Sequence, residues 1–331
     1  MRQRFGSFAL GCLASSIVAL AILPVQAAAD HGDKPLRITA GSPGWDHSFP
    51  FIAEQNGYWK KYGLKVEFVQ GSFVRNNQLM SIGDLDAGYT QISDVMRYVE
   101  GGIPFRIVAS TTYGAATIVG APGIKSMADL KGKTIAVTNL KNVQYLTLVH
   151  HIFPRFGLTL QNTKLLRISA AEVAAVVISN QVQAAFPFEP YGVDAVGKGA
   201  TMVLDWDQII DKKVLPNTEM FRNSFVMHDR LRVKHPDLAK KVVWAHLDAL
   251  DFLRKNPDKA TDILARYAKR IDKKLMRAAY DKMGLTHSKV PESWVDQLAD
   301  WNLKSKFAKR RLTAAEVTDY SFQKGHSAAQ N

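Results

Sequence analysis

Cysteine is almost absent from this sequence: its 331 residues include only Cys12. A single cysteine excludes a disulfide framework and leaves no cysteine pair for a zinc site. The sequence also contains no G-x-S-x-G nucleophile motif and no H-E-x-x-H metal motif. Gly132-Lys133-Thr134 resembles the end of a phosphate-binding loop, but Met127 stands where that loop requires its first glycine. Without a recognisable catalytic apparatus, we expect no enzyme, no metal and no cofactor.

Long hydrophobic runs are equally scarce, and the one that occurs begins the chain. Arg2 and Arg4 precede an apolar run from about residue 8 to residue 23, and small residues follow up to Ala29. A positive start, a short apolar run and an A-x-A site are typical of a secretory signal peptide, which we predict over residues 1–29. Lipid anchoring at Cys12 is the alternative, but the apolar run continues well past that residue. We expect a free periplasmic protein.

Acidic residues are outnumbered: 30 Asp and Glu stand against 43 Lys and Arg, which gives a net charge of +13. Removal of residues 1–29 would take away two arginines and no acid, which leaves about +11. The basic residues are scattered, and the densest cluster is formed by Lys304, Lys306, Lys309, Arg310 and Arg311. Because an exported protein rarely meets nucleic acid, we expect no such partner. An anionic ligand, an anionic membrane surface or solubility alone would account for the charge.

The sequence does contain an alternation of short apolar runs and amphipathic segments of helical length, the pattern of a mostly parallel sheet wrapped by helices. We therefore predict an α/β fold. A first set of elements is expected with strands at residues 36–40, 65–69, 87–90 and 105–110 and helices at 49–56, 74–82 and 93–99.

A second, similar set begins at residue 134, with strands expected at 134–137, 164–168, 183–186 and 201–204 and helices at 143–156, 171–179 and 190–196. On the helix expected at 143–156, His150 and His151 are adjacent and should point apart, which argues against a metal pair. After an extended run at 221–227 the chain is expected to be wholly helical. Pro236 begins one of these helices, and its apolar face comprises Leu238, Val242, Ala245, Ala249 and Leu253.

Four segments are similar to motifs of a known family. Residues 51–67 (FIAEQNGYWKKYGLKVE) look like its opening pattern A-x-x-x-G-Y/F-F-x-x-E-G-L-x-V, and residues 82–88 (IGDLDAG) look like x-G-x-x-D-x-G. Residues 123–137 (GIKSMADLKGKTIAV) resemble the start of a second lobe, and residues 180–191 (NQVQAAFPFEPY) resemble G-x-x-D-A-x-x-x-x-E-P-Y. From residue 37 to residue 256 the chain resembles the periplasmic substrate-binding proteins of the nitrate, sulfonate and taurine class of ABC importers.

The resemblance implies a two-lobed type II periplasmic binding protein fold, with a first lobe at residues 36–118 and 225–331 and a second at 119–221. It also implies a small-molecule solute and, as partners, an inner-membrane ABC permease with its cytoplasmic ATPase. A monomer is expected. Three residues depart from the family pattern: Asn180 replaces a glycine, Gln183 an aspartate and Phe188 a tryptophan. These departures concern the identity of the solute and not the fold.

Candidate ligand-binding residues of the first lobe lie in loops that follow strands and precede helices, because ligands bind outside the carboxyl ends of such strands and helix N-termini favour anions. These candidates are Trp45, His47, Phe73, Arg75, Gln91, Ser93 and Tyr113. Arg75 would form a forked pair with a sulfonate or carboxylate. Trp45 as a packed aromatic, and His47 and Arg75 as surface residues, are the structural alternatives. Asp46 and Ser48 are expected to cap the following helix.

In the second lobe the candidates are Asn139, Asn142, Phe188, Glu189 and Tyr191. The two asparagines lie at the start of an expected helix, and they would form a second helix N-terminus that can bind an anion. Phe188 would stack on a planar group, and Tyr191 would donate a hydrogen bond. Glu189 would either accept a hydrogen bond from an amine or only cap its own helix.

Together these residues predict a protein that captures a small organic anion, a sulfonate or an aromatic carboxylate, by lobe closure. A neutral pyrimidine or another heterocycle related to thiamine precursors is the alternative, since Trp45, Tyr113 and Phe188 would stack on it equally well. The fold also resembles a thiamine-pyrimidine synthase, but the cysteine-rich iron motif of that enzyme is missing. A receptor sensor domain would need a second membrane span, and no second long apolar run follows residue 29.

Overall fold

The computed structural model describes residues 34–40, 44–71, 73–267 and 272–329. The predicted signal peptide lies outside the described residues, and so does the side chain of Phe73. Within the part of the chain that is described, no helix is both long enough and apolar enough to span a membrane.

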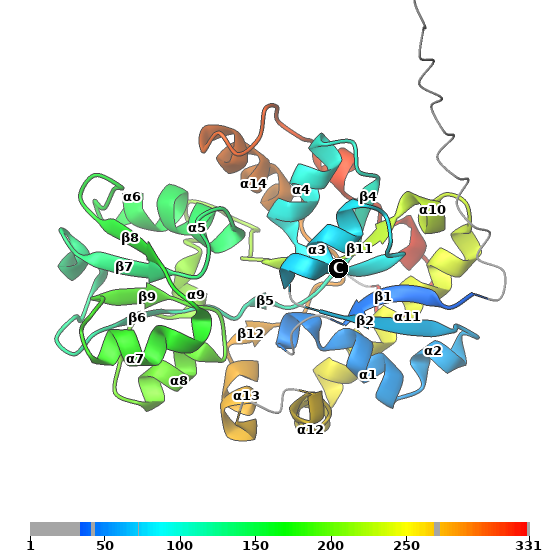
Figure 1. The fold of residues 1–331 in the computed structure, drawn as a ribbon, viewed down its shortest axis with the longest axis horizontal. Helices are drawn as coiled ribbons and strands as arrows, with labels where there is room; N and C mark the ends of the chain where they lie inside the picture. The colour runs from blue at the N-terminus through cyan, green and yellow to red at the C-terminus, as the bar shows by residue number, and fades with distance from the viewer. Residues whose placement is uncertain (1–33, 41–43, 72, 268–271, 330–331) are drawn as a thin grey trace, which may run out of the picture. The chain divides into compact units, whose positions relative to one another are not determined.

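Five strands form a first mixed sheet in the order β2–β1–β3–β11–β4 (Figure 1). Strand β1 is parallel to β2 and β3, whereas β11 is antiparallel to β3 and β4. The strands are β1 Leu36–Ala40, β2 Val66–Gln70, β3 Ala87–Gln91, β4 Phe105–Ser110 and β11 Asn223–His228. The helices that accompany them are α1 Phe49–Gln55, α2 Tyr58–Lys61, α3 Phe73–Ser81, α4 Ile92–Glu100 and α10 Asp229–Arg232.

A second mixed sheet has the order β10–β6–β9–β7–β8, with β7 parallel to β8 and β9 and with β6 antiparallel to β9 and β10. Its strands are β6 Ile118–Gly120, β7 Thr134–Val137, β8 Lys164–Arg167, β9 Ala184–Phe186 and β10 Thr201–Leu204. Its helices are α5 Val143–Thr147, α6 Phe153–Arg155, α7 Val173–Ile178, α8 Tyr191–Gly197 and α9 Trp206–Ile209. We refer to the two sheets with these helices as the first half and the second half.

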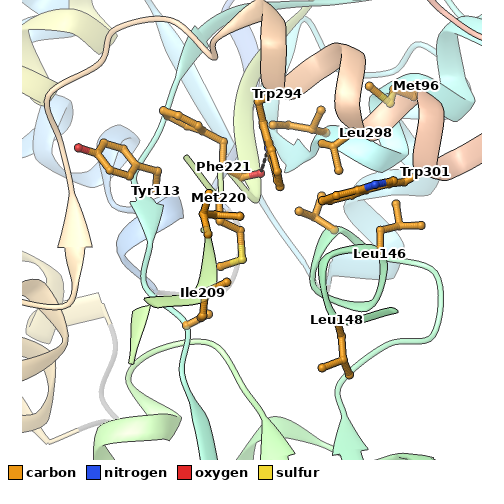
Figure 2. Packing of buried hydrophobic residues seen from close by; sticks show 14 of the residues in the cluster. Met96, Tyr113, Leu146, Leu148, Ile209, Met220, Phe221, Trp294, Leu298 and Trp301 are labelled. Atoms are coloured by element: carbon orange, nitrogen blue, oxygen red, sulfur yellow. Dashed lines mark hydrogen bonds between the residues drawn. The ribbon is translucent and has the colours of Figure 1, made fainter. Parts of the chain in front are cut away.

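The chain crosses between the two sheets twice, before β6 and before β11. In the first crossing, β5 (Tyr113–Gly114) pairs with β12 (Met283–Gly284). The Tyr113 ring lies 4.9 Å from the ring of Phe221, which belongs to the second crossing. Figure 2 shows that Trp294 packs there too, and its indole N–H donates to the Phe221 carbonyl at 2.8 Å. The crossing segments are therefore held by a shared apolar core.

Helices dominate the remaining chain, with bounds α11 Pro236–Lys255, α12 Pro257–Tyr267, α13 Lys273–Tyr280, α14 Glu292–Lys304 and α15 Ala314–Val317. The expected apolar face of α11 is confirmed: Val242, Ala245, Ala249 and Leu253 are fully buried, while Leu238 is half-buried. Helix α14 packs against both α4 of the first half and α5 of the second.

The helix predicted at 143–156 differs from the observed one in its middle, where residues 148–152 form a π-helical turn between α5 and α6. Pro154 has no N–H to donate to the carbonyl of His150, so the regular hydrogen-bond pattern cannot continue. His150 and His151 both pack near Trp301, with 6.1 and 6.3 Å between ring centres, but they have different hydrogen-bond partners: His150 Nε2 lies 2.6 Å from Ser305 Oγ, and His151 Nε2 accepts from the Asp211 N–H at 3.0 Å. The strands β5, β6 and β12 and helix α9 were also not predicted.

Candidate functional site

The buried carboxylate of Asp46 organises the edge of the first sheet at which β1 ends. Asp46 lies in a short 3-10 helix, Trp45–His47, and is 4% exposed. One of its oxygens accepts a hydrogen bond from Thr112 Oγ1 at 2.9 Å, and the other accepts from Arg222 Nε at 2.9 Å and Asn223 Nδ2 at 2.5 Å. Burial alone would raise the pKa of Asp46, but the Arg222 guanidinium, His47 and the Thr112 hydrogen bond together outweigh burial and keep this pKa below its usual value. The two residues form a buried ion pair.

Neither residue that was expected to cap the next helix does so. The Asp46 carboxylate is occupied by Arg222 and its other donors. Ser48 has helical backbone angles, φ −74° and ψ −25°, whereas a capping residue needs an extended backbone. Its hydroxyl donates instead to the Trp45 carbonyl at 2.8 Å.

Several buried polar atoms at this edge have no hydrogen-bond partner among the described residues: His47 Nδ1, Ser93 Oγ, Asn223 Oδ1 and Ser224 Oγ. Ser93 lies in the first turn of α4, just after Gln91, which pairs with Asn223 between β3 and β11. Burial lowers the pKa of His47 to about 4, so this imidazole is neutral at pH 7. Since buried polar groups normally have partners, this edge has hydrogen-bonding capacity left for water or a bound molecule.

A cavity of about 530 Å³ lies at the edge of the second sheet where β7, β8 and β9 end. It is lined by Thr138, Arg167, Ile168, Ser169, Ala170, Glu172 and Phe188. Glu172 is used locally, because its carboxylate accepts a hydrogen bond from the Ser169 backbone N–H at 2.9 Å. The side chain of Arg167 is exposed and makes no hydrogen bond or ion pair with another described residue. The cavity volume is in the range of small-molecule sites, and the charged residues of its lining are Arg167 and Glu172.

Phe188 is the point at which the cavity meets the second crossing segment, where Arg222 directly precedes β11. The Arg222 guanidinium carbon lies 4.2 Å from the centre of the Phe188 ring, a cation–π contact. Tyr191 contacts the same ring edge to face at 5.3 Å. The polar cluster around Asp46 and the cavity are thus joined through Arg222 and Phe188.

Two predicted aromatic residues lie in the core and not on the cavity. Trp45 is 2% exposed, and its indole N–H donates to the Met276 carbonyl at 2.9 Å. Tyr113 shares a hydrogen bond of 2.8 Å with the Thr286 hydroxyl and packs on Phe221. Trp45 therefore occupies the place expected of its structural alternative, an aromatic residue packed in the core.

Glu189 serves its own helix. It is 4% exposed, and its carboxylate accepts hydrogen bonds from the Val193 N–H at 2.9 Å and the Thr117 hydroxyl at 3.1 Å. Burial raises the pKa of Glu189 despite these two hydrogen bonds. The capping alternative therefore fits the structure, since Val193 is in the first turns of α8.

The two asparagines are also used locally. Asn142 caps α5, with its side-chain oxygen accepting from the Tyr145 N–H at 2.9 Å. Asn139 accepts from the Lys141 N–H at 2.7 Å within the preceding turn. Among the other candidates, Arg75 is exposed on α3 and Gln91 is half-buried at the end of β3.

The structure therefore brings together two groups of predicted residues: His47, Gln91 and Ser93 in the first half, and Phe188 and Tyr191 in the second. Arg222, Asn223, Arg167 and Thr138 were not among the predicted residues. Thr138 directly follows β7, and Arg167 is the last residue of β8. Their place at the carboxyl ends of strands could have identified both as candidate ligand-binding residues. Arg222 precedes an antiparallel strand, and no local pattern marks it.

Two mixed α/β sheets flanked by helices and joined by two crossing segments define the fold of the type II periplasmic binding proteins. The model of the family described as "NMT1/THI5 like" matches residues 45–260, most of the chain, so the protein belongs to this family. A Brucella abortus (strain 2308) protein named "Putative binding protein BAB2_1146" is 26% identical over 260 residues, which cover 77% of each chain.

Solved structures show the same fold. The ligand binding component of an ABC-type import system from Staphylococcus aureus has a TM-score of 0.75 at 15% identity, covering 88% of this chain and 99% of that one. The periplasmic nitrate-binding protein NrtA from Synechocystis PCC 6803 has a TM-score of 0.72 at 15% identity, covering 89% and 88%. The periplasmic aliphatic sulphonate binding protein SsuA from Escherichia coli has a TM-score of 0.71 at 17% identity, covering 86% and 92%.

Proposed function

We propose that this protein is the solute-binding component of an ABC import system in the periplasm and that it captures a small organic anion, a sulfonate or an aromatic carboxylate. The observation that carries the proposal is the cavity of about 530 Å³ at the edge of the second sheet, because Phe188 in its wall also touches Arg222, which directly precedes β11 of the first half. A solute seated there would contact the second half and lie beside the segment that leads into the first.

Lobe closure is the mechanism we propose for capture. The lobes would be residues 36–118 with 225–331 and residues 119–221, and they would turn on the crossing segments around Tyr113 and Phe221. A solute stabilises the closed form only through contacts that the open form lacks. A permease with its cytoplasmic ATPase would then recognise the closed protein, a monomer released into the periplasm after loss of residues 1–29. It would perform no catalysis.

Anion preference is supported by the charges around the cavity. The lining carries one charge of each sign, but the Glu172 carboxylate is directed to the Ser169 N–H, whereas the Arg167 side chain has no partner among the described residues and can contact an anion. The ring of Phe188 offers an apolar surface to the rest of the solute. Several relatives of the same fold are named for sulfonate or nitrate, which agrees with this preference.

A neutral heterocycle remains the second candidate because of one observation. Asp46 and Arg222 neutralise each other, and His47 is uncharged at pH 7, so the first-half cluster has no net charge. Its buried atoms without partners, including Ser93 Oγ, are suited to hydrogen bonds with a neutral ring.

A thermal-shift screen of a chain that begins at Asp30 separates these candidates. Benzenesulfonate, benzoate, taurine and nitrate represent anions, and an aminopyrimidine represents the heterocycles. A ligand that binds only the folded protein raises its melting temperature by mass action. We expect a shift with benzenesulfonate or benzoate. A shift with the aminopyrimidine alone would favour the second candidate and contradict the first.

Variants of the cavity wall then test its location by calorimetry. Phe188→Ala should weaken binding of the stabilising anion by about tenfold or more, a loss typical of an aromatic contact. Phe156→Ala is the matched control, since Phe156 is also half-buried and also lies under an arginine, Arg155, at 5.3 Å, but does not line the cavity.

The charge of the cavity is tested by a second pair of variants. Arg167→Gln should weaken binding of the anion severalfold, whereas Lys164→Gln at the other end of β8 should not. Equal effects within either pair would refute this location of the site.

A further inference from the structure

Arg222 has more hydrogen-bond donors than the fold uses. A guanidinium carries five N–H groups, on Nε, Nη1 and Nη2. Here Nε and Nη2 both donate to the same oxygen of Asp46, and Nη1 makes no hydrogen bond to any described residue. Only 12% of the side chain is exposed. One edge of the guanidinium is therefore committed to Asp46, and the edge at Nη1 remains available.

The position of Arg222 is set by its partner. Asp46 is buried, and Thr112 and Asn223 donate to it as well, so its carboxylate has little freedom to turn. Separating a buried ion pair leaves an uncompensated charge and is costly. The guanidinium is thus held in one place before a solute arrives, and a preorganised group loses less entropy on binding.

The flat face of Arg222 lies on Phe188, the residue that also lines the cavity. A charge in this half-enclosed position is screened less by water and salt than that of the exposed Arg167. Arg222 adjoins the cavity lining through Phe188 without being part of it, so an anionic group that extends past Phe188 would meet the guanidinium, while an apolar group would meet the ring.

We propose that Arg222 is the specificity-determining residue of this site: it keeps its Nε edge on Asp46 and gives its Nη1 edge to a sulfonate or carboxylate beside Phe188. The inference rests on the proposed function and assigns to Arg222, rather than to the exposed Arg167, the larger part of its charge selectivity. Asp46 is then a positioning residue, which acts on the solute only through Arg222.

Two probes of similar shape test the proposal: benzenesulfonate, which is an anion, and benzenesulfonamide, which is uncharged at pH 7. Calorimetry compares the wild-type chain with Arg222→Gln and Arg222→Lys. We expect R222Q to weaken benzenesulfonate binding by about tenfold or more and benzenesulfonamide binding by less than about threefold. For R222K, the loss of benzenesulfonate affinity should be intermediate. A single ammonium group cannot pair with Asp46 and with the solute through two separate edges, as a guanidinium can. Arg106→Gln, on β4, is the control arginine and should match the wild type.

Circular dichroism and melting temperature establish that each variant is folded. Should R222Q fail to fold because Asp46 is left as a buried unpaired charge, the double variant Asp46→Asn with Arg222→Gln supplies the second measurement: it removes both charges of the buried pair together, so binding of benzenesulfonate should weaken while benzenesulfonamide is spared. Equal losses for both probes, or no loss, would overturn the assignment of selectivity to Arg222 and leave the proposed function standing. A wild-type chain that binds none of the sulfonates and carboxylates would overturn the proposed anion class and this inference together.

Discussion

Gly284 in β12 lies directly against the ring of Tyr113. A Cβ atom at this glycine would be 1.9 Å from Tyr113 Cζ, far closer than atoms can pack. The ring cannot retreat freely, because its hydroxyl is bonded to Thr286 and its face packs on Phe221. Gly284→Ala should therefore lower the free energy of unfolding by about 1–3 kcal/mol, the usual cost of overpacking. Urea unfolding of the purified chain measures this.

Gly197→Ala provides the matched control. Gly197 ends α8, and a Cβ there would have no neighbour within 4 Å. Alanine has a higher helix propensity than glycine, so the control should be unchanged or stabilised by up to about 1 kcal/mol. If G284A were as stable as G197A, the close contact between β12 and β5 would not exist in solution.

The candidate site could be predicted from sequence only where it depends on local order along the chain. Phe188 and Ser93 were identified because they follow strands, and strand ends meet at one edge of a sheet. Trp45 could not be distinguished from a ligand-stacking aromatic, because its burial depends on Met276, far away in sequence. Arg222 was missed for the same reason, since its partner Asp46 is brought to it only by the folded sheet.

Among the helices, α5 offers a direct test of a cap against a ligand contact. The side-chain oxygen of Asn142 accepts a hydrogen bond from the Tyr145 N–H, and this satisfies a helix N–H that has no partner within the helix. Asn142→Ala should lower the free energy of unfolding by about 1 kcal/mol, as measured by urea unfolding. Asn142→Asp keeps an acceptor at the cap and should retain wild-type stability. An N142A variant as stable as the wild type would show that the cap contributes nothing.

Most helices and strands could be predicted to within one or two residues, because periods of two and of 3.6 in apolar residues are visible in the sequence. β1, β4, β7 and β10 have the predicted bounds. β5 and β12 are two residues long and show no period, since they exist only by pairing with each other. The apolar residues of the π-helical turn at residues 148–152 keep the spacing of a regular helix, so Pro154 was the only residue that indicated an irregularity there.

Across the chain as a whole, three buried histidines couple stability to pH. Burial lowers the pKa of His246 to about 3 and those of His47 and His151 to about 4. His246 is fully buried between Phe49 and Phe225, and its Nε2 lies 2.8 Å from the Ser110 carbonyl. These rings are held neutral in the folded state, whereas in the unfolded chain a histidine has a pKa near 6.5.

The sign of the resulting pH dependence follows from this difference. Above pH 6.5 the histidines are neutral in both states, and the folded state keeps its full stability. As pH falls below 6.5 the unfolded chain binds protons that the folded chain does not, so stability decreases until the folded pKa values, about 4 and about 3, are reached. From pH 7 to pH 5, a fully buried histidine such as His246 should cost on the order of 2 kcal/mol.

Urea unfolding at pH 7 and pH 5 tests this coupling. The free energy of unfolding should fall between these two values in the wild type, and the fall should be smaller in His246→Gln, which has no titratable ring although it is less stable at pH 7. Because His151 lies in the other half, away from His246, the two contributions should add, and the double variant with His151→Gln should depend on pH less than either single variant. A fall that is unchanged in the double variant would mean that other groups, and not His246 and His151, cause the loss of stability in acid.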